Sequence, residues 1–186
     1  MYKRQVLRTD FTKRDRLRLR LSYVLGDTLR LGLHVTGVNQ TNDGVGNDLD
    51  GRSRTYGADV EASPWKGLSL RLGANRFTSD SSLSILQPYD YSLGSSIHEE
   101  RGTDLSGGVT YTLDPATFSL GVSRFENKGS YPFDIDRARL SVEVGFAKQF
   151  GVVGEWGFDS YHEPNRGSAS YDANRYGIYL RWHPID

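Results

Sequence analysis

The sequence of 186 residues has no cysteine, one methionine and no long apolar run. Without cysteine, the chain has no disulfide, no thiolate metal site and no covalently attached c-type haem. No segment approaches the roughly 20 apolar residues that a transmembrane helix needs. The formal net charge is zero, from 23 basic and 23 acidic residues, which does not favour electrostatic binding to nucleic acid. Residues 1–8 are basic but no apolar stretch follows them, so we do not expect a signal peptide here.

What the sequence does contain is alternation of polar and apolar residues, which predicts β-strands. In residues 137–146 one set of alternate positions reads Ala, Leu, Val, Val, Phe and the other reads Arg, Arg, Ser, Glu, Gly. The pattern predicts nine strands, at 16–25, 28–38, 53–63, 67–77, 103–113, 116–125, 137–148, 151–160 and 174–183. A weaker strand is expected at 4–12, before the break at residues 13–15, and no helix is expected to exceed one turn.

The predicted connections alternate between short turns and long polar loops. Short turns fall at Gly26-Asp27, 64–66, Asp114-Pro115 and Gln149-Phe150, and long loops at 39–52, 78–102, 126–136 and 161–173. Turn-forming residues stand where hairpins require them. The longest loop, 78–102, has enough aliphatic and aromatic residues to pack over a mouth or against a partner. Short turns at one end and long loops at the other are typical of transmembrane β-barrels.

Glycines indicate which face of the strands is crowded. Eight of them, Gly32, Gly57, Gly73, Gly108, Gly121, Gly145, Gly157 and Gly177, share the polar set of alternate positions. A crowded polar interior and an apolar exterior belong to a barrel in a membrane, and the mean hydropathy of −0.55 agrees because alternation cancels the hydropathy signal. We expect an all-β, antiparallel, up-and-down transmembrane barrel of about ten strands. It forms a single domain over 1–186, with 1–15 a weak first strand or tail and 183–186 a C-terminal tail.

Aromatic residues near the strand ends predict two interfacial girdles. One girdle lies toward the short turns and the other toward the loops. The first contains Tyr23, Trp65, Tyr111, Phe118, Phe146, Phe150 and Trp182, and the second Tyr56, Phe77, Phe158, Tyr161 and Tyr176.

The last predicted strand carries a more specific signal. Tyr176, Ile178 and Leu180 alternate before a near-terminal aromatic, Trp182, and this resembles the C-terminal assembly signal of bacterial outer-membrane β-barrels. The hairpin at 63–73 also resembles those of large porin-like barrels, including barrels that sheathe multihaem cytochromes. The resemblance implies localisation in the outer membrane, recognition by the barrel-assembly machinery and a bilayer as surroundings. It also leaves open that the chain is the C-terminal part of a larger barrel.

The polar positions predict the lining of a lumen. They carry Arg16, Arg18, Arg20, Arg30, Arg71, Arg137, Arg139, Arg175 and Arg181, opposed by Asp59, Glu61, Asp104, Glu143, Glu155 and Asp159. These charges either pair to fill a narrow barrel or line a water-filled passage that favours anions. The first functional hypothesis is a porin-like channel for small polar solutes. The alternatives are a structural barrel that anchors or sheathes a periplasmic partner such as a cytochrome, and a soluble lipocalin-like barrel with its apolar face inward.

Other sites are weaker in the sequence. The glycine-rich segment with Asp43, Asn47, Asp48 and Asp50 could offer oxygen ligands to calcium, although it lacks the glutamate of an EF-hand. The four histidines, His34, His98, His162 and His183, are scattered. No catalytic motif is present. We therefore expect no enzyme activity, no cofactor and no nucleic-acid partner.

Overall fold

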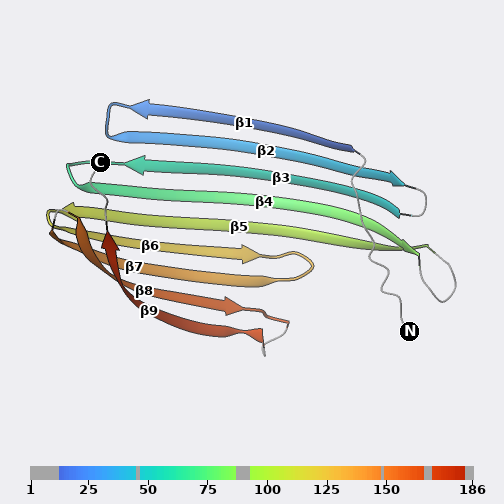
Figure 1. Ribbon diagram of the computed structural model, residues 1–186. Coiled ribbons are helices and arrows are strands. Elements are labelled where there is room, and N and C mark those ends of the chain that lie inside the picture. The colour runs from blue at the N-terminus through green and yellow to red at the C-terminus, as the bar shows by residue number, and fades with distance from the viewer. Residues whose placement is uncertain (1–12, 45–46, 87–92, 148, 166–168, 183–186) are drawn as a thin grey trace.

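The computed structural model describes residues 13–44, 47–86, 93–147, 149–165 and 169–182. They form nine β-strands that follow one another across a single sheet (Figure 1). The strands are β1 (Lys13–Leu25), β2 (Leu29–Gly44), β3 (Asn47–Ala62), β4 (Leu68–Leu86), β5 (Leu93–Leu113), β6 (Ala116–Asn127), β7 (Phe133–Ala147), β8 (Phe150–His162) and β9 (Tyr171–Trp182). Each strand pairs antiparallel with the next. The all-β meander and its nine clear strands are thus confirmed, while the weak strand at 4–12 lies outside the described residues. The break expected at 13–15 is wrong, because these residues are the first of β1 and pair with β2.

The four short turns fall where the sequence predicts them, and all four lie at one end of the sheet, the left of Figure 1. Two of these turns use glycine with a positive φ, 58° at Gly26 and 87° at Gly67, a conformation that other residues adopt with difficulty. Gly67 is also tightly placed, because a Cβ there would come within 2.4 Å of the carbonyl oxygen of Thr112. No described helix is long and apolar enough to cross a membrane.

The long loops of the prediction are wrong in extent, because much of each is strand. β4 and β5 continue through 78–86 and 93–102, and β2 and β3 through 39–44 and 47–52. Alternation ends in these segments, since polar and charged residues replace most apolar ones on the otherwise apolar positions. The backbone pairing nevertheless continues. A strand with water on both faces needs no alternation, so the pattern that identifies the strands cannot show where they end.

The sheet has two faces of opposite character. The apolar face carries Leu17, Leu19, Leu33, Leu72, Val122 and Leu140, which are between 41% and 63% exposed. The polar face carries the charged residues and lies on the opposite side by strand alternation. Among the described residues only two hydrophobic side chains are buried, Val38 and Val153. A sheet with so little interior is not stabilised by a water-excluding core of its own, so its apolar face requires another apolar medium.

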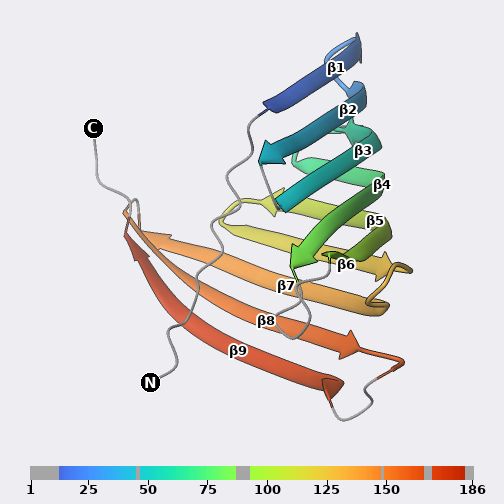
Figure 2. The ribbon, with the colours of Figure 1, turned by 90° about the vertical axis from the view of Figure 1, so that its right-hand side faces the viewer.

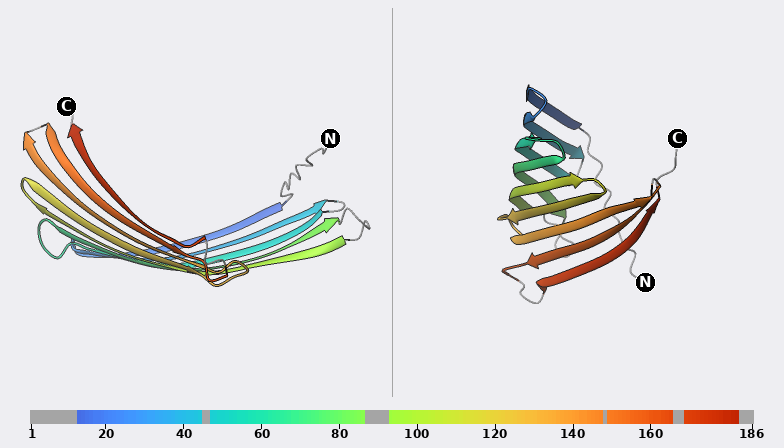
Figure 3. Two further views of the ribbon diagram at one scale, coloured as in Figure 1. Left: turned by 90° about the horizontal axis from the view of Figure 1, so that it is seen from below. Right: turned by 90° about the vertical axis from the view of Figure 1, so that its left-hand side faces the viewer.

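The sheet is strongly twisted and curved, and its two edges do not meet. Figures 2 and 3 show β1 and β9 at opposite ends of the array. Within the described residues the strand order runs from β1 to β9 with no pairing that closes the sheet.

Candidate functional site: the polar face of the sheet

The strand register places all the predicted charged residues on the polar face. Directly opposed residues on neighbouring strands share a face, and the pairs Arg20–His34, Arg30–Glu61, Glu61–Arg71 and Arg137–Asp159 connect the set across the sheet. The same rule assigns Arg16, Arg18, Asp59, Asp104, Arg139, Glu143, Glu155, Arg175 and Arg181 to this face. Whether the face lines a lumen stays a prediction.

Asp159 is the centre of one charged cluster. Its carboxylate lies 3.2 Å from the guanidinium of Arg137 and also pairs with Arg175 on β9. The Asp159 side chain is 19% exposed, less than either arginine. Nearer the short turns, Glu143 pairs with Arg181 across β8. These pairs connect side chains of β7, β8 and β9 on the polar face.

Glu61 is the centre of a second cluster. Its carboxylate accepts a hydrogen bond of 2.8 Å from Arg71 on β4, and it lies 3.9 Å from Arg30 on β2. The side chains of both arginines are more than half exposed. Exposed ion pairs are worth at most about 1 kcal/mol each, so both clusters set the charge pattern of the face more than they stabilise the fold.

A third set of arginines makes no ion pair with the described residues. Arg14, Arg16, Arg18 and Arg20, here named the arginine row, occupy consecutive polar-face positions of β1 and are exposed. Their opposite residues on β2 are Gln40, Val38, Thr36 and His34. Within the described part of the chain, no member of the row makes an ion pair. Arg139 on β7 likewise has none there, and it stands between Gly121 and Gly157.

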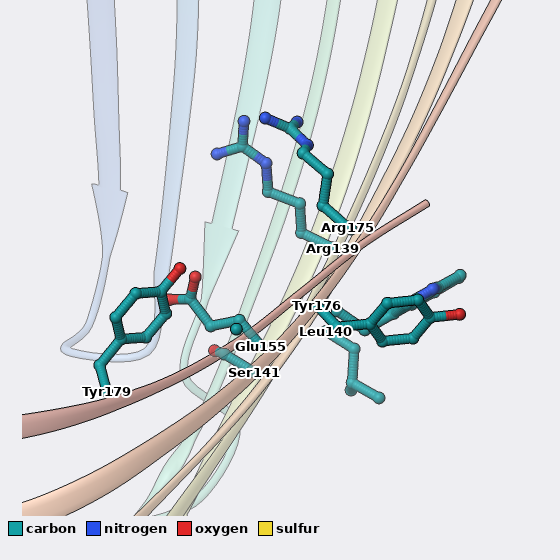
Figure 4. A pocket seen from close by; sticks show the side chains of 10 residues that line it. Arg139, Leu140, Ser141, Glu155, Arg175, Tyr176 and Tyr179 are labelled. Atoms are coloured by element: carbon teal, nitrogen blue, oxygen red, sulfur yellow. The ribbon is translucent and has the colours of Figure 1, made fainter. Parts of the chain in front are cut away.

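Figure 4 shows how the two faces separate at β7–β9. Arg139 and Arg175 extend side by side from one side of the ribbon, while Leu140 and Tyr176 extend from the other. Glu155 and the hydroxyl end of Tyr179 lie close together on the side of the arginines. Tyr179 reaches this position because Gly177 leaves room for its ring, as a Cβ at Gly177 would be 2.4 Å from the tyrosine oxygen.

Near the middle of the sheet, Gly57 leaves room for polar side chains, as Gly177 does for Tyr179. A Cβ at Gly57 would come within 2.1 Å of the His34 ring and 2.2 Å of the Asn75 Oδ1 atom. Asn75 donates a hydrogen bond of 3.2 Å to Asp104, while its own Oδ1 is buried without a partner. All eight glycines predicted for the polar face lie on it. Crowding does not explain every one, since a Cβ at Gly121 would meet nothing within 4 Å.

A ladder of aromatic rings crosses the polar face near the longer connections. Phe77, Phe125, Phe133, Tyr161 and Tyr171 follow one another with ring centroids 5.5 to 5.8 Å apart. Phe77 reaches Phe125 over Gly102, where a Cβ would be 2.0 Å from the ring. The assignment of Phe77 and Tyr161 to an outer girdle is therefore wrong, because both lie on the polar face. Nearness to a strand end does not decide on which face an aromatic residue lies, because the face depends on the parity of the residue along the strand.

The remaining predicted sites are placed as follows. Tyr176, Ile178, Leu180 and Trp182 lie on the apolar face of β9 and are 62% to 82% exposed; their role as an assembly signal stays a prediction. Asp50 is exposed on β3, whereas the side chains of Asp43, Asn47 and Asp48 lie outside the description, so the calcium prediction is untested. In the described residues no three His, Asp or Glu side chains gather as a metal site.

Sequence reasoning missed Arg14, Tyr179 and most of the aromatic ladder. Arg14 and Tyr179 could have been found by parity, since they continue the alternate positions of Arg16 and Arg181. Phe133 contacts Phe125 and Tyr161, and no sequence signal indicates those contacts because they depend on the register between strands. Residues 128–130 were also missed: Lys128 and Ser130 donate backbone hydrogen bonds of 2.8 and 2.6 Å to Arg101 and Glu99 of β5.

Comparison with known proteins bears on the fold. No protein-family model matches the sequence, and no curated protein matches it. The outer membrane channel DcaP of Acinetobacter baumannii is 13% identical, with a TM-score of 0.51 over 89% of this chain and 61% of that one. OmpT, an outer membrane protein of Vibrio cholerae, is 16% identical as expressed in the outer membrane, with a TM-score of 0.56 over 91% of this chain and 56% of that one. Its in-vitro folded trimer form is 14% identical with the same TM-score and coverage.

The chain thus spans 56% to 61% of the length of these structures. At such low identity the likeness concerns the fold. Each of these proteins is an outer membrane protein, and the likeness confirms the predicted fold; localisation of this chain in the outer membrane stays a prediction. The prediction that the chain is not an enzyme stays a prediction. The chain has the fold of the bacterial outer-membrane β-barrel proteins.

Proposed function

We propose that the chain forms the wall of a porin-like channel in the bacterial outer membrane. Its polar face lines a water-filled lumen that passes small polar solutes and favours anions. The observation that carries the proposal is the pairing of an apolar band on one face with an excess of arginine on the other.

The apolar band has the dimensions of a membrane. From the short turns upward, alternate residues of β7 read Val144, Val142, Leu140 and Ala138 before Asp136 ends the series. The same series on β4 runs from Leu68 to Ala74, before Arg76. Four alternate positions cover about 20–27 Å along a strand, which is close to the roughly 25 Å lipid-facing band of outer-membrane barrels.

Closure of the barrel requires further strands. β1 and β9 both run from the end with the longer connections toward the short turns (Figure 1). If the two edges paired with each other, or with a second copy in the same orientation, each seam would be parallel. Antiparallel pairing throughout requires an odd number of added strands. The first and the last of them then both run opposite to β1 and β9. If strands are evenly spread, nine strands over 56% of a chain correspond to about 16 in total, an even number as in bacterial barrels, which leaves about seven to be added.

The charge on the polar face supports preference for anions. The predicted lining has nine arginines against six carboxylates, and Arg14 adds a tenth arginine. Asp159 and Glu61 each pair with two arginines, so these acids are already engaged. A wide passage with excess positive charge attracts anions and repels cations.

The lipid-facing residues of β9 extend the proposal to assembly. We infer that Tyr176, Ile178, Leu180 and Trp182 are read by the barrel-assembly machinery while β9 is an open edge. Their side chains project on the apolar face, which is accessible to a partner before lipid covers it.

Conductance across a planar bilayer tests the channel. Protein purified from outer membranes should conduct, and a KCl gradient should give a reversal potential of the sign expected for anions. Arg139→Gln should reduce that preference because Arg139 has no carboxylate partner in the described residues. The matched control is Arg54→Gln, which removes the same charge from the opposite face of β3 and should leave the reversal potential unchanged. Inserted protein that does not conduct would contradict the proposal and favour a structural role.

A further inference from the structure

We propose that the arginine row of β1 (Arg14, Arg16, Arg18 and Arg20) is a binding track for a linear polyanion, a solute that carries several negative groups along one chain. The inference rests on the proposed function in one respect, which is that the polar face is in contact with water. It concerns the solute class that this face binds.

The spacing of the arginine row suits an extended ligand. Alternate residues of a strand lie about 7 Å apart, so four of them cover about 20 Å. The row begins at the level of Asp15, where the apolar series of β1 has already ended, and continues beside Leu17, Leu19 and Leu21. It therefore extends from the end with the longer connections into the membrane-spanning part of the strand.

The row differs from most other arginines of the polar face, because those arginines have carboxylate partners. Arg30 and Arg71 have Glu61, Arg137 and Arg175 have Asp159, and Arg181 has Glu143. The residues that oppose the row on β2 are uncharged or, at His34, imidazole. Within the described residues, four arginines without an ion pair thus stand in one line, whereas every other arginine of the polar face except Arg139 has a carboxylate partner.

A linear polyanion gains more from this arrangement than a small anion does. One exposed ion pair contributes at most about 1 kcal/mol, so a single phosphate or carboxylate is held weakly. Once one group of a chain is bound, the next group meets its arginine at a high effective concentration, and the contributions accumulate. The arginine row should therefore bind a solute more tightly when more negative groups are linked in one chain.

Calorimetry with polyphosphates tests this inference on protein purified from outer membranes in a non-ionic detergent. Orthophosphate, tripolyphosphate and a polyphosphate long enough to span about 20 Å are compared at equal phosphate concentration. We expect affinity to rise steeply with chain length. In Arg16→Gln/Arg18→Gln the longest chain should bind roughly tenfold more weakly. The slope of log affinity against log salt should fall by about 2, one for each lost contact.

Arg54→Gln is the matched control, with far-UV circular dichroism to show that each variant keeps its β-structure. Affinity independent of chain length would overturn the inference, and so would an equal loss in Arg54→Gln. Absence of binding would overturn it too, and would indicate that acidic residues of a strand beside β1 neutralise the row. Conductance separates the two proposals. A protein that conducts but does not bind polyphosphate supports the proposed function and contradicts the binding track. A protein that binds polyphosphate but does not conduct supports the binding track and contradicts the proposed channel.

Discussion

Replacing Leu140 by arginine tests the orientation of the whole sheet in the membrane. Leu140 lies on the apolar face of β7, opposite Leu120 and Trp156, and within the apolar series from Val144 to Ala138. An arginine near the middle of the lipid-facing band should cost about 2–4 kcal/mol of unfolding free energy. At Val144, about 14 Å further along the strand toward the short turns, the cost should fall to about 0–1 kcal/mol.

The assay is urea unfolding of the protein reconstituted in lipid vesicles, followed by tryptophan fluorescence. Ser141→Arg is the matched control, since Ser141 is the next residue of β7 and lies on the polar face beside Glu155; we expect a change below about 1 kcal/mol. Equal costs at Leu140 and Val144, or a larger cost at Ser141, would refute the assignment of the faces. A soluble barrel with an apolar interior would instead be severely destabilised at both apolar positions.

Two further substitutions address particular contacts. Gly129→Ala should detach residues 128–132 from β5, because its Cβ would lie 2.0 Å from the carbonyl oxygen of Glu99; limited proteolysis should then cut this segment, whereas Gly121→Ala, with open space around it, should stay resistant. Asp159→Asn should release the two arginines that it pairs with and shift the reversal potential toward anions, and an unchanged or cation-ward potential would contradict the assigned role of the polar face.

Much of the fold is predictable because lipid and water impose opposite demands on neighbouring residues of a strand. The apolar series on β7 and the arginines between its members are visible in the sequence, and the register places the two sets on opposite faces of the sheet. The prediction fails where those demands end. Beyond Arg76 on β4 and Thr103 on β5, regular alternation of polar and apolar residues ends, so the sequence resembles a loop although the strands continue.

The sequence predicts on which face of the sheet each residue of the candidate site lies, but it does not predict which residues contact one another. Alternation is enough to group Arg137 with Arg139, yet the pairing of Arg137 and Arg175 with one Asp159 depends on the register across β7, β8 and β9. Register is set by turn geometry and by packing between strands, neither of which a single strand's sequence contains. The aromatic ladder escaped notice for the same reason, since Phe125 and Phe133 meet only after the hairpin has formed.

The attachment of residues 128–130 to β5 bears on the noise of the current that an open channel would carry. Ser130 and Lys128 donate backbone hydrogen bonds to β5, Glu99 returns one of 2.9 Å to the Ser130 hydroxyl, and the buried Asn127 side chain donates to the carbonyl oxygen of Tyr131. A connection fastened at so many points cannot swing across an opening independently of its neighbours. In a conducting protein we therefore expect a quiet open-channel current on this side of the entrance, free of the flicker that a loose hairpin imposes on passing ions.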